Sequence, residues 1–404
     1  MKPQLAKGVN DLAVKERILK EELLDIIVRN FRKYGFNPLQ TPTIERFDVL
    51  TSKFAGGEEI LKEIYRLNDQ GNRELALRYD LTVPLARFVS MNLDLKLPFK
   101  RYQIGQVFRD GPIKAGRYRE FTQCDADVVG SDSLFTDAEL LKMASDVYKE
   151  LGLDVIIKIN SRKVLDALID VDDKNSFILS LDKLEKIGSK GVKLELLSKG
   201  FKEIDIDEVL RKISLSKDEL KEELGDSFDE MQEVLDYLDV LGVDNVEFTP
   251  SLARGLAYYT GTIYEFFLKD SNMTSSVGSG GRYDKMISEF ANKNLPAVGV
   301  SFGLDALMYA LAGDKRSFTK VLGVSINQDK KTIELVSKLR YFNINCDISF
   351  KNLKKSLSFA SSYNIPYVLI VGDEEVNSQR FVLRNMESGT EDKFSEEELI
   401  NFFS

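Results

Sequence analysis

Four cationic side chains, Arg109, Lys114, Arg117 and Arg119, lie within a short segment that is rich in Gly and Pro. A guanidinium group donates two parallel hydrogen bonds to phosphate oxygens, so an arginine at a strand end can grip a polyphosphate together with arginines on a facing loop. The segment therefore predicts a phosphate site. On these residues alone, a solvated hairpin with ordinary surface charges explains the pattern equally well.

Three polar side chains, Gln123, Asp125 and Asp127, follow the cationic segment at a spacing of two. Alternating runs at 102–108 and 121–129, separated by a segment with Gly and Pro, predict a β-hairpin with a long loop. Successive side chains of a strand point to opposite faces, so these three share one face. If that face is buried, the three side chains need polar partners, and a polar ligand is a natural one.

The sequence contains no histidine, which excludes a histidine general base, a catalytic triad with histidine and a histidine metal site. Its two cysteines, Cys124 and Cys346, are far apart and form no CxxC pair, so neither a disulfide framework nor a zinc site is expected. Chemistry must then use carboxylates, arginines, lysines, hydroxyls or groups of the substrate. The missing histidine fits compositional drift as well as selection for translation when histidine is scarce.

The length of 404 residues allows two or three domains with large cores. A net charge of −9 argues against non-specific nucleic-acid binding over the whole surface, but not against a local basic patch. No run approaches the length of a membrane span, and the first residues lack the apolar core of a signal peptide. We therefore expect a cytoplasmic protein with no membrane contact.

The stretch YQIGQVFRDGPIKAGRYREFTQCDADVVG, residues 102–130, resembles motif 2 of class II aminoacyl-tRNA synthetases in its histidyl-tRNA synthetase form. Residues 254–265, RGLAYYTGTIYE, are similar to the histidine-binding signature of histidyl enzymes. Residues 77–84, LRYDLTVP, resemble the family segment that holds the α-amino group of the amino acid. Three separated motifs in the right order make this resemblance highly specific, and it covers nearly the whole chain.

The resemblance implies a role for each matching residue. Histidine would be bound by Asp80, Leu81, Thr82, Gln123, Asp127, Arg254, Tyr258 and Tyr259. ATP would be bound by Arg109, Arg117, Arg119, Phe121 and Arg282, with Mg²⁺ on the outer phosphates. Arg254 and Arg109 would be the catalytic residues. From the residues alone, Asp80 and Thr82 fit a helix N-cap equally well, since both are good capping residues.

Motif 1 and motif 3 also have counterparts. The resemblance identifies residues 14–34 and the following proline-broken strand as motif 1, with Pro42 as its marker, and implies a homodimer through it. Residues 296–307 resemble motif 3, but Ala306 stands where the family has the arginine that meets the ATP γ-phosphate. Ala257 replaces the usual Asp of the histidine signature, and the usual Arg-x-Glu of motif 2 reads RDG at 109–111. Arg117 or Arg282 could compensate for Ala306.

The expected fold is an α+β catalytic domain with an antiparallel sheet, carrying a helical insertion, followed by a small C-terminal α/β domain. Residues 1–160 and 246–318 would form the catalytic domain, and the Lys-, Glu- and Leu-rich residues 161–245 the insertion. Residues 321–404 alternate strands and helices, which predicts a mainly parallel sheet and resembles the anticodon-binding domain. One of its helices begins with Lys351, Lys354 and Lys355. These lysines form either a surface that contacts tRNA or merely a solvated face.

The resemblance implies histidyl-tRNA synthetase activity: ATP activates histidine to histidyl-adenylate, and the histidyl group passes to the 3′ end of tRNA(His). Two alternatives remain. One is an inactive synthetase-like regulatory subunit of ATP phosphoribosyltransferase in histidine biosynthesis, which Ala306 favours and the kept histidine motifs and C-terminal domain oppose. The other is an RNA-binding module without enzymatic activity.

Overall fold

The structure is a computed structural model that describes residues 2–52, 61–113, 116–253, 258–291, 293–313 and 316–403. The chain divides into two compact units, one formed by residues 1–10 and 23–310, the other by residues 11–22 and 311–404. Among the described residues, no helix is both long enough and apolar enough to cross a membrane.

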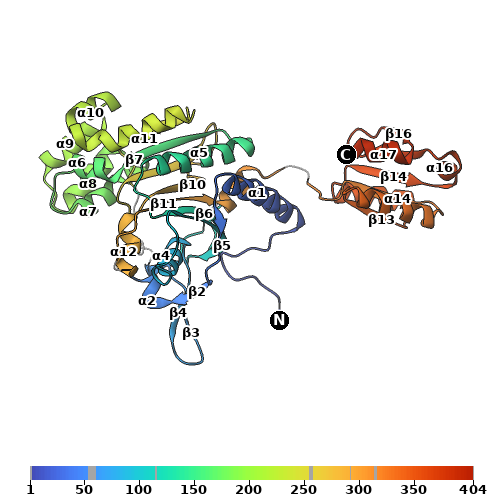
Figure 1. Cartoon of the computed structure of the whole chain (residues 1–404), viewed down its shortest axis with the longest axis horizontal. Helices are drawn as coiled ribbons and strands as arrows, with labels where there is room; N and C mark the ends of the chain where they lie inside the picture. The colour runs from blue at the N-terminus through green and yellow to red at the C-terminus, as the bar shows by residue number, and fades with distance from the viewer. Residues whose placement is uncertain are drawn as a thin grey trace. The chain divides into compact units, whose positions relative to one another are not determined.

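An eight-stranded sheet in the order β1-β5-β6-β11-β10-β9-β7-β8 forms the centre of the large unit (Figure 1). Its strands are β1 (Asn37–Pro38), β5 (Phe99–Phe108), β6 (Glu120–Val129), β7 (Val155–Ser161), β8 (Val246–Phe248), β9 (Thr262–Leu268), β10 (Gly278–Arg282) and β11 (Ala297–Gly303). The two outermost pairs, β1–β5 and β7–β8, are parallel, and all other neighbours are antiparallel. The predicted α+β architecture with an antiparallel sheet is thus confirmed.

One face of this sheet is apolar and is covered by two helices, α1 (Val14–Lys33) and α5 (Phe135–Glu150). The ring of Phe31 on α1 lies 5.4 Å from that of Tyr102 on β5 and 5.9 Å from that of Phe302 on β11. Tyr148 on α5 packs 5.4 Å from Phe302 in the same way. Burying these large rings drives the helices onto the sheet, at roughly 25 cal/mol for each Å² of apolar surface removed from water.

The elements near the opposite face are small. A three-stranded sheet in the order β2-β4-β3 and several short helices belong to this part of the unit. They are β2 (Ile44–Arg46), α2 (Phe47–Leu50), β3 (Arg66–Asn68), β4 (Glu74–Leu77), α4 (Thr82–Ser90) and α12 (Asp284–Ala291). Helix α13 (Leu304–Ala310) directly follows β11 and contacts β6. Helices α4 and α12 pack against each other, on the side of the sheet away from α5 (Figure 1). The hairpin and the strand–helix pair of 297–310 lie where the sequence predicted them.

A group of helices separates β7 from β8, in the stretch predicted to be a helical insertion. They are α6 (Arg162–Leu168), α7 (Lys174–Leu181), α8 (Leu184–Ser198), α9 (Glu203–Ile213), α10 (Lys217–Leu224), the 3₁₀ turn η1 (Gly225–Phe228) and α11 (Asp229–Val240). Buried apolar residues such as Phe177, Leu196 and Phe228 give the group a core of its own. Its basic and acidic residues form surface ion pairs, for example Arg211 with Glu223 at 2.7 Å.

The C-terminal unit holds a five-stranded sheet in the order β13-β12-β14-β15-β16. Its elements are β12 (Val321–Ser325), α14 (Asp329–Tyr341), β13 (Cys346–Ser349), α15 (Leu353–Ser362), β14 (Tyr367–Val371), α16 (Asp373–Ser378), β15 (Phe381–Asn385), β16 (Glu391–Phe394) and α17 (Glu396–Phe403). The expectation of a mainly parallel sheet is wrong in part: β12 is parallel to β13 and β14, whereas β14–β15 and β15–β16 are antiparallel. The last two strands follow short connections, which permit only antiparallel pairing.

Gly299 on β11 shows how closely the large sheet is packed on its polar face. A Cβ atom at this position would lie 1.9 Å from Oδ1 of Asp127 on the neighbouring strand β6. At Gly303, at the end of the same strand, a Cβ would meet its nearest atom, the Val277 carbonyl oxygen, at an ordinary 3.5 Å. The absence of a side chain at position 299 therefore leaves room for a buried carboxylate. At position 303 there is no such close neighbour, and a side chain would have space.

We predict that Gly299→Ala lowers the free energy of unfolding by about 1–3 kcal/mol, because the added methyl must displace a buried charged group. The matched variant Gly303→Ala should stay within about 0.5 kcal/mol of the parent chain. Urea unfolding followed by circular dichroism measures both. Equal effects of the two substitutions would show that the close contact at Gly299 has no energetic consequence.

Candidate active site

The polar face of the large sheet gathers the side chains that the sequence placed at a spacing of two. Strand pairing puts Asp127 opposite Arg101 of β5 and Gly299 of β11. Asp125 lies opposite Gln103 and Ser301, and Gln123 lies opposite Gly105 and Gly303. Because paired residues share a face, these strands present carboxylates, amides and a guanidinium together.

Asp127 is buried and is held from two sides. Its Oδ2 lies 2.7 Å from Nη2 of Arg101, whose side chain is fully buried, and the Tyr283 hydroxyl donates a hydrogen bond to Oδ1. Burial raises the pKa of Asp127, and the charge of Arg101 and the bond from Tyr283 oppose that rise. The carboxylate is thus fixed in orientation by a cation and a phenol.

Arg101 also connects Asp127 to the segment before α4. Its Nη2 donates to the carbonyl oxygen of Leu81 at 3.2 Å. Next to this carbonyl, Oδ1 of Asp80 accepts a hydrogen bond from the backbone N–H of Val83 at 3.1 Å, at the start of α4. Asp80 therefore caps the helix, which is one of the two interpretations that its sequence position allows. Burial raises the pKa of Asp80 to about 6, opposed by that backbone hydrogen bond and by the charge of Arg109.

Arg109, at the end of the first hairpin strand, lies beside Asp80 and Phe121. Its Nε donates to the Tyr79 carbonyl oxygen at 3.0 Å, and its guanidinium carbon lies 5.1 Å from the centre of the Phe121 ring. Burial lowers the pKa of Arg109, and the carboxylate of Asp80 opposes this. An arginine remains charged under such conditions, so a positive group stands at the edge of the polar face.

The other cations of the hairpin loop differ in how they are engaged. Nη1 of Arg119 forms an ion pair with Asp110 at 2.7 Å, and its Nε donates to the Gly111 carbonyl oxygen at 3.3 Å. Arg119 therefore braces the loop. Arg117 is exposed. It follows Gly116, where a Cβ would lie 3.7 Å from Cα of Ala306 on α13. Lys114 lies outside the described residues.

Two tyrosines close the site near Asp127. The rings of Tyr258 and Tyr259 lie 4.6 Å apart, and Tyr258 meets the edge of Tyr283 at 6.1 Å. A Cβ on Gly281 would come within 2.8 Å of the Tyr259 ring, so this ring lies directly over the backbone of β10. The expected catalytic Arg254, like Ala257, lies outside the described residues, and its part stays a prediction.

Known proteins are similar to this chain in both sequence and fold. The family model described as histidyl-tRNA synthetase matches residues 8–307, and a model of an anticodon binding domain matches residues 320–404. The chain belongs to the histidyl-tRNA synthetase family. It is similar to Histidine--tRNA ligase 1 of Bacillus anthracis, 43% identical over 418 aligned residues that cover 98% of each chain.

Two solved structures show how far the similarity extends. The histidyl-tRNA synthetase of Nostoc sp. PCC 7120 superimposes with a TM-score of 0.88 at 29% identity, covering 100% of this chain and 99% of that one. A Bacillus halodurans protein described as an ATP phosphoribosyltransferase regulatory subunit/histidyl-tRNA synthetase gives a TM-score of 0.75 at 21% identity, covering 92% and 99%. The second match shows a shared fold only.

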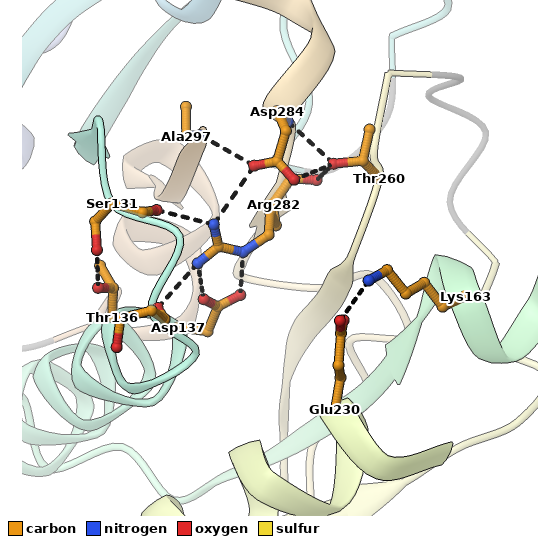
Figure 2. A network of polar contacts seen from close by, with 10 residues as sticks. Ser131, Thr136, Asp137, Lys163, Glu230, Thr260, Arg282, Asp284 and Ala297 are labelled. Carbon is orange, nitrogen blue, oxygen red and sulfur yellow. Dashed lines mark hydrogen bonds and ion pairs between the residues drawn. The ribbon is translucent and has the colours of Figure 1, made fainter. Parts of the chain in front are cut away.

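Arg282, which the resemblance assigns to ATP binding, is engaged by protein oxygens in this structure. Its five N–H groups all point at protein oxygens, as Figure 2 shows: Asp137 takes two, and the carbonyl oxygens of Ser131 and Ser133 and Oδ1 of Asp284 take the rest. Burial disfavours the charged guanidinium, but Asp137 outweighs this and raises the pKa of Arg282. An ATP role for Arg282, and a compensation for Ala306 by this residue, would require some of these contacts to be exchanged, and both stay predictions.

Several members of the site cannot be found from the sequence. Arg101, Tyr283 and Ser301 contact Asp127 or Gln123, but they come from separate parts of the chain, on β5, directly after β10 and on β11. Only the register of β5, β6 and β11 brings them together, and a single sequence does not state which strands pair. The one available signal was the spacing of two along a strand. Arg101 and Gln103 share one face of the first hairpin strand, as Asp125 and Asp127 do in the second.

The described residues offer no cluster of three or more Cys, Asp or Glu side chains that could hold a metal ion. The described part of the site holds guanidinium and carboxylate groups on one face of the sheet.

We predict that Arg282→Ala lowers the free energy of unfolding by about 3–5 kcal/mol, because it leaves the buried Asp137 without a cation. The double variant Arg282→Ala/Asp137→Ala should lose less than the single variant. The partly exposed pair of Arg119 provides the control, and Arg119→Ala should cost at most about 1 kcal/mol. Urea unfolding measures all three. An intact fold with an impaired KM for ATP in Arg282→Ala would support the phosphate role.

Proposed function

We propose that this chain is a histidyl-tRNA synthetase, which activates histidine with ATP and attaches it to the 3′ end of tRNA(His). The observation that carries the proposal is the buried carboxylate of Asp127, oriented by Arg101 and Tyr283 and enclosed by aromatic rings. Such a carboxylate can accept a hydrogen bond from an imidazole N–H, which few other amino acids could supply in the same place.

The histidine pocket would lie on the polar face. We propose that Asp127 and Tyr259 bind the two imidazole nitrogens, with Tyr258 beside them. Asp80, Thr82 and Gln123 would take the α-ammonium group, with Leu81 lining the pocket. The contact of Tyr258 with Tyr283, and of Tyr283 with Asp127, supports one continuous pocket.

ATP would bind along the hairpin. Phe121 would stack on adenine, Arg109 would bind the α-phosphate, and Arg254 would stabilise charge between that phosphate and the histidine carboxylate. Phosphates would arrive with Mg²⁺. For the outer phosphates we propose Arg117, because it is exposed and its neighbour Gly116 lies against Ala306, where the family usually has an arginine. If Arg119 also contacts ATP, its guanidinium must serve both the phosphate and the ion pair with Asp110.

The reaction then has two steps. In the first, a carboxylate oxygen of histidine forms a bond to the α-phosphorus, the bond to the β-phosphate oxygen breaks, and pyrophosphate leaves. In the second, a hydroxyl at the 3′ end of tRNA attacks the histidyl carbonyl carbon, and AMP leaves. The arginines act by placing reactants and neutralising charge that develops on phosphate oxygens.

We propose that different segments of the chain form domains with different functions. Residues 1–160 and 246–318 would form the catalytic domain, 161–245 an insertion, and 321–404 the anticodon-binding domain. A homodimer would form through the motif 1 region around Pro42. We also propose that the protein acts in the cytoplasm, where its tRNA substrate is used.

We predict histidine-dependent exchange of labelled pyrophosphate into ATP, because adenylate formation is reversible and needs only small molecules. Exchange should vanish when histidine is omitted or replaced by another amino acid. If folded protein with Mg²⁺ shows no exchange above background, the regulatory-subunit alternative gains support. Exchange without any charging of tRNA would instead point to a defect in the second step.

A second prediction concerns Lys351, Lys354 and Lys355, which are exposed at the start of α15. Lys351 and Lys355, with Asn352 and Ser358, line a hollow of about 410 Å³. Reversing all three lysines to Glu should weaken tRNA binding, and the salt slope should decrease by roughly one unit for each lysine–phosphate interaction that is removed. Pyrophosphate exchange should not change. Measuring tRNA affinity and aminoacylation at several salt concentrations tests this effect.

The control for these lysines is Lys338→Glu on α14 in the same domain. Lys338 is already paired with Glu396 at 2.8 Å, so we expect little change in tRNA affinity. A triple variant with the parent affinity and salt slope would rule out this surface as the tRNA contact.

A further inference from the structure

The polar face of the sheet contains buried polar atoms that the protein itself does not satisfy. Among the described residues, Gln123 Oε1, Asp125 Oδ1, and Nε and Nη1 of Arg101 are buried without a hydrogen-bond partner. They occupy neighbouring positions on β5 and β6. Buried polar atoms without partners cost free energy, so a cluster of them on one face indicates a place for a polar ligand.

Two of these atoms are acceptors that share an immediate environment. The Ser301 hydroxyl accepts a hydrogen bond from Nε2 of Gln123 at 2.9 Å, which leaves Oε1 of this amide without a donor. Ser301 also lies opposite Asp125 in the strand register and forms a side-chain hydrogen bond with it. Gln123 Oε1 and Asp125 Oδ1 thus both require a donor, and Asp125 is only 3% exposed.

The cations around Asp125 are committed elsewhere. Arg101 forms its short contact with Asp127, not with Asp125. Arg78 donates through Nε to the Gln106 carbonyl oxygen at 2.8 Å and through Nη1 to the Thr41 carbonyl oxygen at 2.9 Å. The short contacts of Arg101 and Arg78 therefore go to other groups, and Oδ1 of Asp125 keeps no donor among the described residues.

We propose that Asp125 binds the α-ammonium group of histidine, together with Asp80 and Gln123, and so completes the amino-acid pocket. This inference rests on the proposed function and adds a residue that the family resemblance did not assign. An ammonium group carries one positive charge and three N–H donors, so it can donate to the two unpartnered acceptors, Gln123 Oε1 and Asp125 Oδ1. Asp127, two residues along the strand, would serve the imidazole ring at the other end of the substrate.

The site would also release a proton when histidine binds. Burial raises the pKa of Asp125 to about 7, with Asp127 and Asp80 adding to the rise and Arg101 and Ser301 opposing it. Arg78 is the other cation that faces this group. Near pH 7 a fraction of Asp125 is protonated in the free protein, and an arriving ammonium would displace that proton. Affinity for the ammonium group should therefore fall as the pH drops through 7.

The experiment compares two ligands that both keep the imidazole ring of histidine and each lack one of its other two charged groups. Histidinol has the ring and the amine without the carboxylate, and imidazolepropionate has the ring and the carboxylate without the amine. For Asp125→Asn, we expect histidinol affinity to fall roughly tenfold or more, as when a charged hydrogen bond is removed, with imidazolepropionate affinity unchanged. Asp127→Asn, the matched change two residues away, should weaken both ligands. Calorimetric titration of the full-length protein measures these affinities.

Proton release provides a readout that needs no variant. Titrations in buffers of different ionisation enthalpy, corrected for the ring pKa of each free ligand, should show proton release with histidinol and none with imidazolepropionate. Asp125→Asn should abolish this difference. Equal proton release with the two ligands, or equal losses of both affinities in Asp125→Asn, would overturn the inference. If the unmodified protein binds neither ligand nor histidine, the proposed function itself fails.

Discussion

The ion pair between Arg101 and Asp127 is the constraint on which the rest of the large unit depends. Both side chains are almost completely removed from water, on the face of the sheet opposite the aromatic core under α1 and α5. Removing two charges from water is costly, and replacing such a pair with apolar residues is often neutral or stabilising. A sheet that keeps charge on one face and rings on the other is therefore organised for a ligand, and its stability comes from the apolar side.

Glycines make this charged face possible, because they let guanidinium and carboxylate groups lie flat against the strands. At Gly105 a Cβ would meet Nη2 of Arg78 at 2.3 Å. Arg78 in turn donates to the carbonyl oxygens of Thr41 and Pro42. Pro42 marks the segment proposed to form the dimer interface, and Asp80 lies two residues after Arg78. One arginine therefore joins the segment around Pro42 to the segment that precedes α4.

Local patterns predicted the local structure well. The helix at 14–33, the hairpin and the shared face of Gln123, Asp125 and Asp127 followed from periodicity and from Gly and Pro positions. What the sequence could not supply was pairing between distant strands. The family resemblance assigned Arg282 to ATP, yet Asp137 in the first turn of α5 and two carbonyl oxygens of the preceding turn lie around it. The mixed C-terminal sheet was missed for a related reason, since alternating strands and helices do not show where the chain reverses.

The alanine at 306 is best understood together with the hairpin loop. Gly116 has a φ of +68°, which favours glycine, and a Cβ at this position would lie 3.7 Å from Cα of Ala306 and from Cβ of Tyr309. A long side chain at 306 would compete for this space. Under the proposed function, the exposed Arg117 that follows this glycine would take the place of the family arginine. The positive charge would then have moved from helix to loop, so the absence of the family arginine does not by itself imply a loss of phosphate binding.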